Sequence, residues 1–131
     1  MADNDLITKI TDIVIQQTVN QKIPTVVFLS SVDKGALVKN IIWTLKGGSK
    51  DENSFTPDDW SKTAEVMQQL AEIPLIVDEI IEIEVTKNKI IDFINELKTS
   101  KGLVVINSDK IKAQEFTTTE NISIIGVGVN N

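Results

Sequence analysis

The sequence has no cysteine, no histidine and no arginine. Without cysteine there is no disulfide, no thiolate nucleophile and no cysteine zinc site. Without histidine there is no imidazole to act as a general base or a metal ligand. Without arginine there is no guanidinium fork for a phosphate and no arginine finger for a phosphoryl transition state. Catalysis of the Ser-His and Cys-His types is therefore excluded.

Positive charge is also scarce, since 13 lysines face 19 acidic residues and the net charge is −6. The lysines are scattered along the chain, so the charge pattern disfavours nucleic acid binding. The N-terminal stretch MADNDLITK is polar and acidic. It predicts neither a signal peptide nor a membrane span, and we expect a cytoplasmic location.

The length and composition fit one folded domain, residues 1–131. A chain of 131 residues buries roughly two-thirds of its unfolded surface, which is enough for a real core. Hydrophobic residues make up 41% of the sequence and charged residues 24%, proportions typical of a globular protein rather than a disordered one. Because aromatic residues are only 5%, the core is expected to be aliphatic.

Amphipathic helices alternate with short apolar strands along the chain. The spacing of apolar side chains predicts helices over residues 5–17, 33–46, 56–71 and 86–98. Short β-branched runs predict strands over residues 25–31, 75–78, 103–107 and 121–129. The stretch EIIEIEV, residues 79–85, fits either a loop or an extended segment. This alternation predicts an α/β domain around a mainly parallel sheet.

The stretch KGLVVINSDK, residues 101–110, carries an apolar strand that ends at Asn107. A nucleotide-hydrolysing enzyme is expected to place a magnesium-binding carboxylate at such a strand end. An amide coordinates magnesium weakly and brings no negative charge. Asn107 therefore raises the question of why this residue is an amide.

The order and spacing of several segments resemble the C-terminal, RecA-like domain of bacterial replicative DNA helicases of the DnaB type. In that family a strand ending in Ser-Leu-Glu-Met is followed by a helix, a glycine-containing loop, an acidic helix start, a strand ending in two acids, and a Walker B strand. The matching segments here are VVFLSSVD (26–33), LKGG (45–48), FTPDDW (55–60), PLIVDE (74–79) and GLVVINSD (102–109). Residues 5–21 match the helix that follows the phosphate loop. The resemblance implies a three-layer sandwich, a trimmed RecA-like fold of the P-loop NTPase class.

The same resemblance implies that the catalytic parts of the family are missing or replaced. The phosphate-binding loop would lie before Asp5 and is not found. The water-polarising glutamate falls on Val32, and the Walker B aspartate falls on Asn107. We therefore expect no catalytic residue, no cofactor and no metal. The last strand, 121–129, either fills the position of the phosphate-loop strand in the sheet or pairs antiparallel at its edge.

Two functional hypotheses follow from this resemblance. The leading one is a non-catalytic domain that acts by protein–protein contact in DNA replication. Its partner would be a replicative helicase, a helicase loader or a second copy of the chain. The alternative is a helicase-type ATPase subunit, or a fragment of a longer product, that completes its active site with groups from another chain. Single-stranded DNA binding is a third hypothesis, which the charge and the absent arginines disfavour.

Trp43 is the candidate for an interaction surface. At about 100° per residue it points away from the apolar face of the helix 33–46, among polar residues that include Lys39 and Lys46. A tryptophan on a polar helix face is either covered by another part of the chain, here the loop 47–55, or available to a partner.

Two further features have simpler interpretations. Trp60 is expected in the core, beside Ala64 and Met67. Asp78 and Glu79 are adjacent acids at a strand end, and they fit solvated loop charges better than a metal pair.

Overall fold

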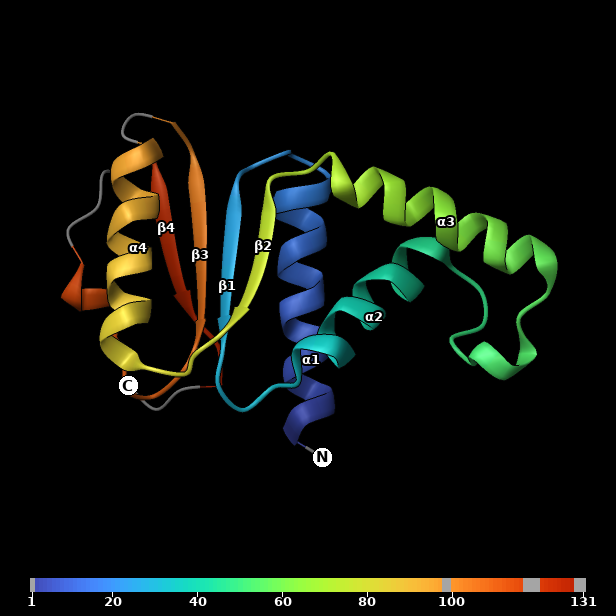
Figure 1. The fold of residues 1–131 in the computed structure, drawn as a ribbon, viewed down its shortest axis with the longest axis horizontal. Coiled ribbons are helices and arrows are strands. Elements are labelled where there is room, and N and C mark those ends of the chain that lie inside the picture. Colours follow the sequence, from blue (N-terminus) through green and yellow to red (C-terminus); the bar gives the residue numbers. More distant parts are fainter. Residues whose placement is uncertain (1, 98–99, 117–120, 129–131) are drawn as a thin grey trace.

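The computed structural model describes residues 2–97, 100–116 and 121–128, and they form an α/β fold around one parallel sheet (Figure 1). The sheet has four strands in the order β2-β1-β3-β4, and each neighbouring pair is parallel. The strands are β1 (Thr25–Leu29), β2 (Leu75–Glu79), β3 (Gly102–Asn107) and β4 (Ile122–Gly126). The predicted α/β class with a parallel sheet is thereby confirmed.

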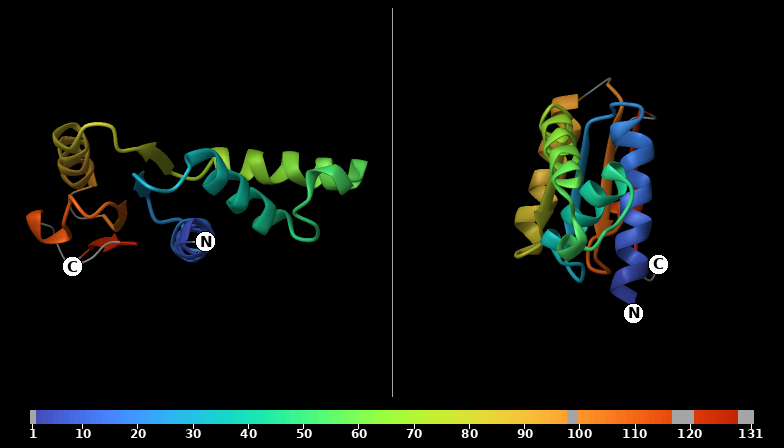
Figure 2. Two further views of the ribbon diagram at one scale, coloured as in Figure 1. Left: turned by 90° about the horizontal axis from the view of Figure 1, so that it is seen from below. Right: turned by 90° about the vertical axis from the view of Figure 1, so that its right-hand side faces the viewer.

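Helices lie on both faces of the sheet. They are α1 (Ala2–Val14), α2 (Lys34–Lys46), α3 (Pro57–Ala71) and α4 (Ile83–Leu97). Figure 2 shows α1 on one face and α4 on the opposite face. α2 and α3 form an arm that extends past the β2 edge of the sheet (Figure 1). No helix within the described ranges is long and apolar enough to cross a membrane.

Shorter helical turns join these elements. α1 continues into a π-helical turn, Ile15–Val19, and short 3-10 turns lie at Glu52–Ser54 and Ala113–Glu115. The π-helical turn is fixed to the sheet by Thr18, whose hydroxyl donates to the Thr25 hydroxyl at 2.6 Å. The end of the first helix is therefore held against the start of β1.

The two faces of the central strands carry separate apolar cores. All residues of β1 and β3 are buried, and alternate side chains point to opposite faces. The strand residues of the core beside α1 are Val27, Leu29, Leu103 and Val105. Those of the core beside α4 are Val26, Phe28, Val104 and Ile106. A strand buried on both faces needs a continuous apolar run, which is why these two segments show no polar alternation.

The edge strands β2 and β4 are only partly buried. Ile76 in β2 is 57% exposed, although Val26, its partner in the register of β1, is 4% exposed. α4 packs over β1 and β3 and leaves the same face of β2 uncovered. The fold therefore presents an apolar strand surface at the β2 edge.

α3 begins with a full capping box and packs against α2 rather than the sheet. The Asp59 amide donates to the Thr56 hydroxyl at 3.2 Å, and the Thr56 amide donates to Asp59 Oδ2 at 2.9 Å. The prediction that Trp60 lies in the core is wrong, since Trp60 is 48% exposed and Met67 is 55% exposed. An arm helix has one neighbour to pack against, so only a narrow stripe of its surface is buried.

The structure decides both segments that the sequence leaves open. Ile83–Val85 belong to the first turn of α4, so the expectation of a loop or an extended segment over 79–85 is wrong for these residues. β4 pairs parallel with β3, so the antiparallel alternative is wrong. Val129, the last residue of the predicted strand, and Lys98, the last of the predicted helix, lie outside the described residues.

Candidate functional site

Asn107 lies at the carboxyl end of β3 and connects its two neighbouring strands. The residue is 1% exposed. Its Oδ1 accepts hydrogen bonds from the backbone N–H groups of Ser30 (3.1 Å), Ser31 (3.0 Å) and Val32 (3.3 Å), in the turn after β1. Its Nδ2 donates to the carbonyl of Val127, directly after β4, at 3.1 Å. One side chain therefore links the ends of β1 and β4 across β3.

The geometry explains why residue 107 is an amide. Asn107 uses both halves of its side chain, the oxygen as an acceptor and the NH₂ group as a donor. An aspartate would turn a second acceptor toward the Val127 carbonyl, and two acceptors form no hydrogen bond. It would also bury a negative charge. The Asn107 side chain binds the backbone at the ends of the neighbouring strands. Its Oδ1 atom already accepts hydrogen bonds, whereas a metal ligand needs a free lone pair.

Further contacts of the backbone around Asn107 hold the ends of β1, β3 and β4 together, and this region is called the Asn107 junction below. The Ser30 hydroxyl donates to the Asn107 carbonyl, and the Val127 amide donates to the Ile106 carbonyl at 2.9 Å. Gly128 has a φ of +71°, and a Cβ built on it would lie 2.7 Å from Leu6 Cδ2 and 3.3 Å from Asn107 Nδ2. Glycine is needed here for its positive φ and its lack of a side chain. The end of β4 is therefore packed closely against α1 and Asn107.

Of the two acids at the end of β2, Asp78 is bound to neighbouring groups and Glu79 is exposed. Asp78 Oδ2 accepts from Lys89 Nζ on α4 at 2.8 Å, and Asp78 Oδ1 accepts from the Glu79 amide at 2.9 Å. The Lys89 hydrogen bond, followed by the Glu79 amide, holds the pKa of Asp78 below its usual value. No group of three or more carboxylates comes together among the residues that the structure describes.

Trp43 belongs to an aromatic cluster at the far end of the arm. Its ring meets Phe55 edge to face, with centroids 5.1 Å apart, and Phe55 meets Trp60 in the same way at 5.0 Å. Trp43 is half-buried while Trp60 is exposed. The residues Trp43, Phe55 and Trp60 are called the aromatic tip below. Trp60 gives the aromatic tip an exposed ring, and the connection between α2 and α3 lies at the end of the arm away from the sheet (Figure 1).

Lys46 is a buried residue that contacts the aromatic tip and the loop between α2 and α3. Its side chain is 0% exposed. Nζ donates to the carbonyls of Gly47 (2.7 Å) and Ser49 (2.9 Å), lies 3.5 Å from Asp59 Oδ1, and stands 4.3 Å from the centre of the Phe55 ring. The Thr56 amide, aided by the Lys46 charge, holds the pKa of Asp59 below its usual value. Lys46 thus stabilises the loop between α2 and α3.

Lys39, the third residue of the predicted interaction surface, is exposed and pairs with Glu52 at 3.2 Å. The structure therefore brings Trp43 and Lys46 together through Phe55 and ties Lys39 to the loop between the arm helices. Phe55 and Trp60 were not identified from the sequence as members of this surface. The signal for them is that FTPDDW places two aromatic residues on either side of a strong helix start.

We predict that Trp43→Ala lowers the free energy of unfolding by about 1–2 kcal/mol, because the ring loses partial burial and one aromatic contact. Trp60→Ala should lower it by less than about 1 kcal/mol, since surface substitutions have small effects. Urea unfolding of both variants measures the difference. A loss of roughly 3–5 kcal/mol in the Trp43 variant, typical of a core tryptophan, would contradict this assignment.

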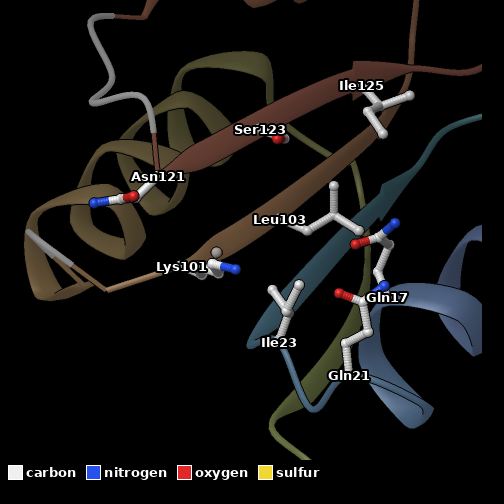
Figure 3. Close-up of a pocket in the computed structure, with 9 residues that line it drawn as sticks. Gln17, Gln21, Ile23, Lys101, Leu103, Asn121, Ser123 and Ile125 are labelled. Carbon is white, nitrogen blue, oxygen red and sulfur yellow. The ribbon is translucent and has the colours of Figure 1, made fainter.

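A separate polar hollow of about 290 Å³ lies at the opposite, amino ends of β3 and β4 (Figure 3). Ile23, Leu103 and Ile125 supply its apolar part. The polar side chains around it are Gln17, Gln21, Lys101, Asn121 and Ser123. These groups offer hydrogen bonds to a small polar molecule. The hollow lies at the opposite end of the strands from the Asn107 junction. Ligands of parallel α/β sheets usually bind beyond the carboxyl ends of the strands, which is the Asn107 end.

Comparison with known proteins adds no relative. No family model matches the chain, and no curated protein matches it.

Proposed function

We propose that this chain is a non-catalytic relative of the motor domain of DnaB-type replicative helicases, and that it acts by protein–protein contact in DNA replication. The observation that carries the proposal is the bonding of Asn107. Both ends of its amide bind the backbone of neighbouring strands, at the position where the resemblance places the magnesium-binding carboxylate. Val32, at the position of the water-polarising glutamate, is buried and apolar.

The arrangement of β4 and α1 supports the RecA-like part of the proposal. β4 runs parallel beside β3 at the edge of the sheet, and a strand in the place of the phosphate-loop strand would also be parallel. Gly128, after β4, meets Leu6 on α1. A phosphate-loop strand and its helix have the same neighbourhood, although here they lie at opposite ends of the sequence. The stretch GVGVNN lacks the lysine and hydroxyl residue that such a loop uses on phosphates.

The flanking helices fit a trimmed three-layer sandwich. α1 and α4 cover opposite faces of the central strands. α2 and α3, which the resemblance sets between the first two strands of the chain, leave the sheet as the arm. The proposal therefore assigns the sheet a structural role and the arm a role in binding.

The aromatic tip is the surface through which we propose that the chain contacts a replicative helicase or its loader. Tryptophan is enriched among interface residues that carry much of the binding energy. Trp60 is exposed and is supported by Phe55 behind it. The Lys46 contacts keep the loop in one conformation, which reduces the entropy lost on binding.

We predict no ATP turnover and no stabilisation by nucleotide. A specific site would raise the free energy of unfolding by roughly 2.7 kcal/mol when ligand is a hundredfold above its dissociation constant. Unfolding should instead be the same with and without magnesium and ATP. Magnesium-dependent turnover above that of an identically prepared control protein would contradict the non-catalytic proposal.

The alternative of a shared active site has its own test. An intact helicase subunit is added in the same assay, and its turnover is compared with and without this chain. The non-catalytic proposal predicts no new turnover beyond modulation of the activity of the subunit itself. Completion in trans predicts new turnover that requires this chain. It also predicts that this turnover is lost when the added subunit lacks its arginine finger.

Binding to purified helicase and loader from the source organism tests the partner. Wild-type protein should bind one of them, and Trp60→Ala should weaken binding about tenfold or more, as expected for a central interface residue. Lys62→Ala, an exposed change on the same helix, is the matched control and should bind like the wild type. Absence of binding to both proteins would remove the replication partner from the proposal.

A further inference from the structure

An apolar groove lies between α4 and the uncovered face of β2. It has a volume of about 310 Å³, and its lining includes Val26, Phe28, Ile76 and Phe93. Val26 and Phe28 are the buried floor, while Ile76 stands open to solvent. Figure 2 shows β2 between α4 and α3 with no helix across it on this side. The groove is therefore an unfilled place in the helical layer of the fold.

The lining residues of α4 form one stripe along the helix. Lys89, Asp92, Phe93 and Glu96 follow one another at spacings of three, one and three residues, which places them on the same side. Phe93 is half-buried, and the acids on either side of it are exposed. The α4 wall of the groove thus combines an apolar centre with negative edges.

The charge along this wall is unbalanced. Lys89 is bound to Asp78 at 2.8 Å, which closes that end of the groove with a neutral pair. Asp92 and Glu96 make no ion pair with any residue in the described ranges. The protein as a whole carries a net charge of −6. Two exposed carboxylates beside an apolar floor favour an occupant with positive charge next to apolar side chains.

We propose that this groove binds an amphipathic α-helix of a partner protein that carries lysine or arginine beside its apolar stripe. The inference rests on the proposed function, a domain that acts by protein contact, and adds where and what it binds. A sheet face is covered by a helix in folds of this type, and helix-in-groove binding uses apolar anchors spaced by three and four residues. Ile76 and Phe93 meet those anchors, and Asp92 and Glu96 meet the basic residues.

The helices of a second copy fit the groove poorly. α3 exposes Trp60 and Met67, but it carries three acidic residues against one lysine. α4 exposes Val85 and Ile91, but it carries three acidic residues against two lysines.

α2 carries lysines beside apolar residues, but its apolar side chains Leu37, Ile41 and Ile42 are buried in its own core. Ile10 and Val14 of α1 are also buried, and Ile15 and Val19 of the π-helical turn are half-buried. The occupant we propose is therefore a helix of another protein.

A labelled leucine–lysine peptide with the spacing of an amphipathic helix is the probe, and fluorescence anisotropy of its titration with the full chain is the measurement. The wild type should bind this peptide at least about tenfold more tightly than a scrambled peptide of the same composition. Ile76→Glu and the double variant Asp92→Lys with Glu96→Lys should each weaken binding about tenfold or more. The double variant Glu65→Lys with Glu72→Lys makes the same charge change at exposed positions, one in α3 and one directly after it, and should leave binding unchanged.

Three results would overturn the groove proposal. The first is equal binding of both peptides. The second is equal weakening by the two charge variants, which would indicate non-specific attraction. The third is a concentration-dependent dimer of the wild type that Ile76→Glu abolishes, which would assign the groove to a second copy. If one of these occurs while Trp60→Ala still weakens helicase or loader binding, the groove is wrong and the proposed function stands.

Discussion

Asn107→Ala should lower the free energy of unfolding by about 3–5 kcal/mol, because it removes the side chain that satisfies the ends of two strands. Three backbone amides, of Ser30, Ser31 and Val32, lose their shared acceptor, and the Val127 carbonyl loses its donor. Each unsatisfied buried group costs about 1–3 kcal/mol, and this applies to Val32 and Val127, which are buried, more than to Ser30 and Ser31, which are exposed. The Ser30 amide keeps a bond to the Asn107 carbonyl, so the total stays below the sum.

Urea unfolding measures this loss, and Asn88→Ala is its matched control. Asn88 lies exposed on α4, and its removal should change the free energy of unfolding by less than about 0.5 kcal/mol. If Asn107→Ala is no less stable than the control variant, Asn107 does not hold the strand ends together, and the structural explanation for the amide fails.

Lys46→Ala should lower the free energy of unfolding by about 2–3 kcal/mol. Its ammonium group makes two charge-assisted hydrogen bonds to loop carbonyls and lies over the Phe55 ring, and hydrogen bonds to charged groups contribute about 1.5–3 kcal/mol. The loop carbonyls of Gly47 and Ser49 belong to exposed residues, so water replaces part of what is lost. The effect should therefore be smaller than that of Asn107→Ala.

Lys46→Met separates charge from packing, because it keeps most of the aliphatic stem and removes the ammonium group. It should recover part of the loss seen in Lys46→Ala. Lys50→Ala, in the same loop but exposed, is the control and should have a small effect. Equal stability of Lys46→Ala and Lys50→Ala would show that the arm does not depend on Lys46.

The alternation of helices and strands was predictable from the sequence because it depends on local periodicity. β1 and β3 are apolar at every position except Thr25, Gly102 and Asn107, and such runs predict strands buried on both faces. The polar loop between α2 and α3 and the Thr56 helix start were visible for the same reason. These features can be predicted without knowing which segments of the chain contact one another.

The parts that the sequence did not predict depend on contacts between distant segments. Trp60 lies outside the core because α3 packs on α2 and not on the sheet, and no local pattern states where a helix packs. The partners of Asn107 are 75 to 77 residues earlier, at Ser30 to Val32, and 20 residues later, at Val127. Its place after an apolar run indicates burial, but the two-sided bonding needs β4 beside β3.

The burial of Lys46 has a similar origin. Helical periodicity assigns it to the polar face of α2 with Lys39 and Trp43, which predicts a solvated side chain. Its carbonyl partners belong to the following loop, and Phe55 closes over it from the start of α3. The lysine is enclosed because the loop folds back, and loop conformation has no periodic signal in the sequence.

Unfolding of Asn107→Asp, with and without magnesium and ATP, tests most directly whether this position is a structural junction rather than a metal site. The variant introduces the carboxylate that a nucleotide-hydrolysing enzyme is expected to place at such a strand end, but it loses the donor to the Val127 carbonyl and buries a charge. We predict that it is about 2–4 kcal/mol less stable than the wild type, and that magnesium and ATP add nothing to either protein. A variant as stable as the wild type, or one that magnesium and ATP stabilise by about 1 kcal/mol or more, would contradict the account.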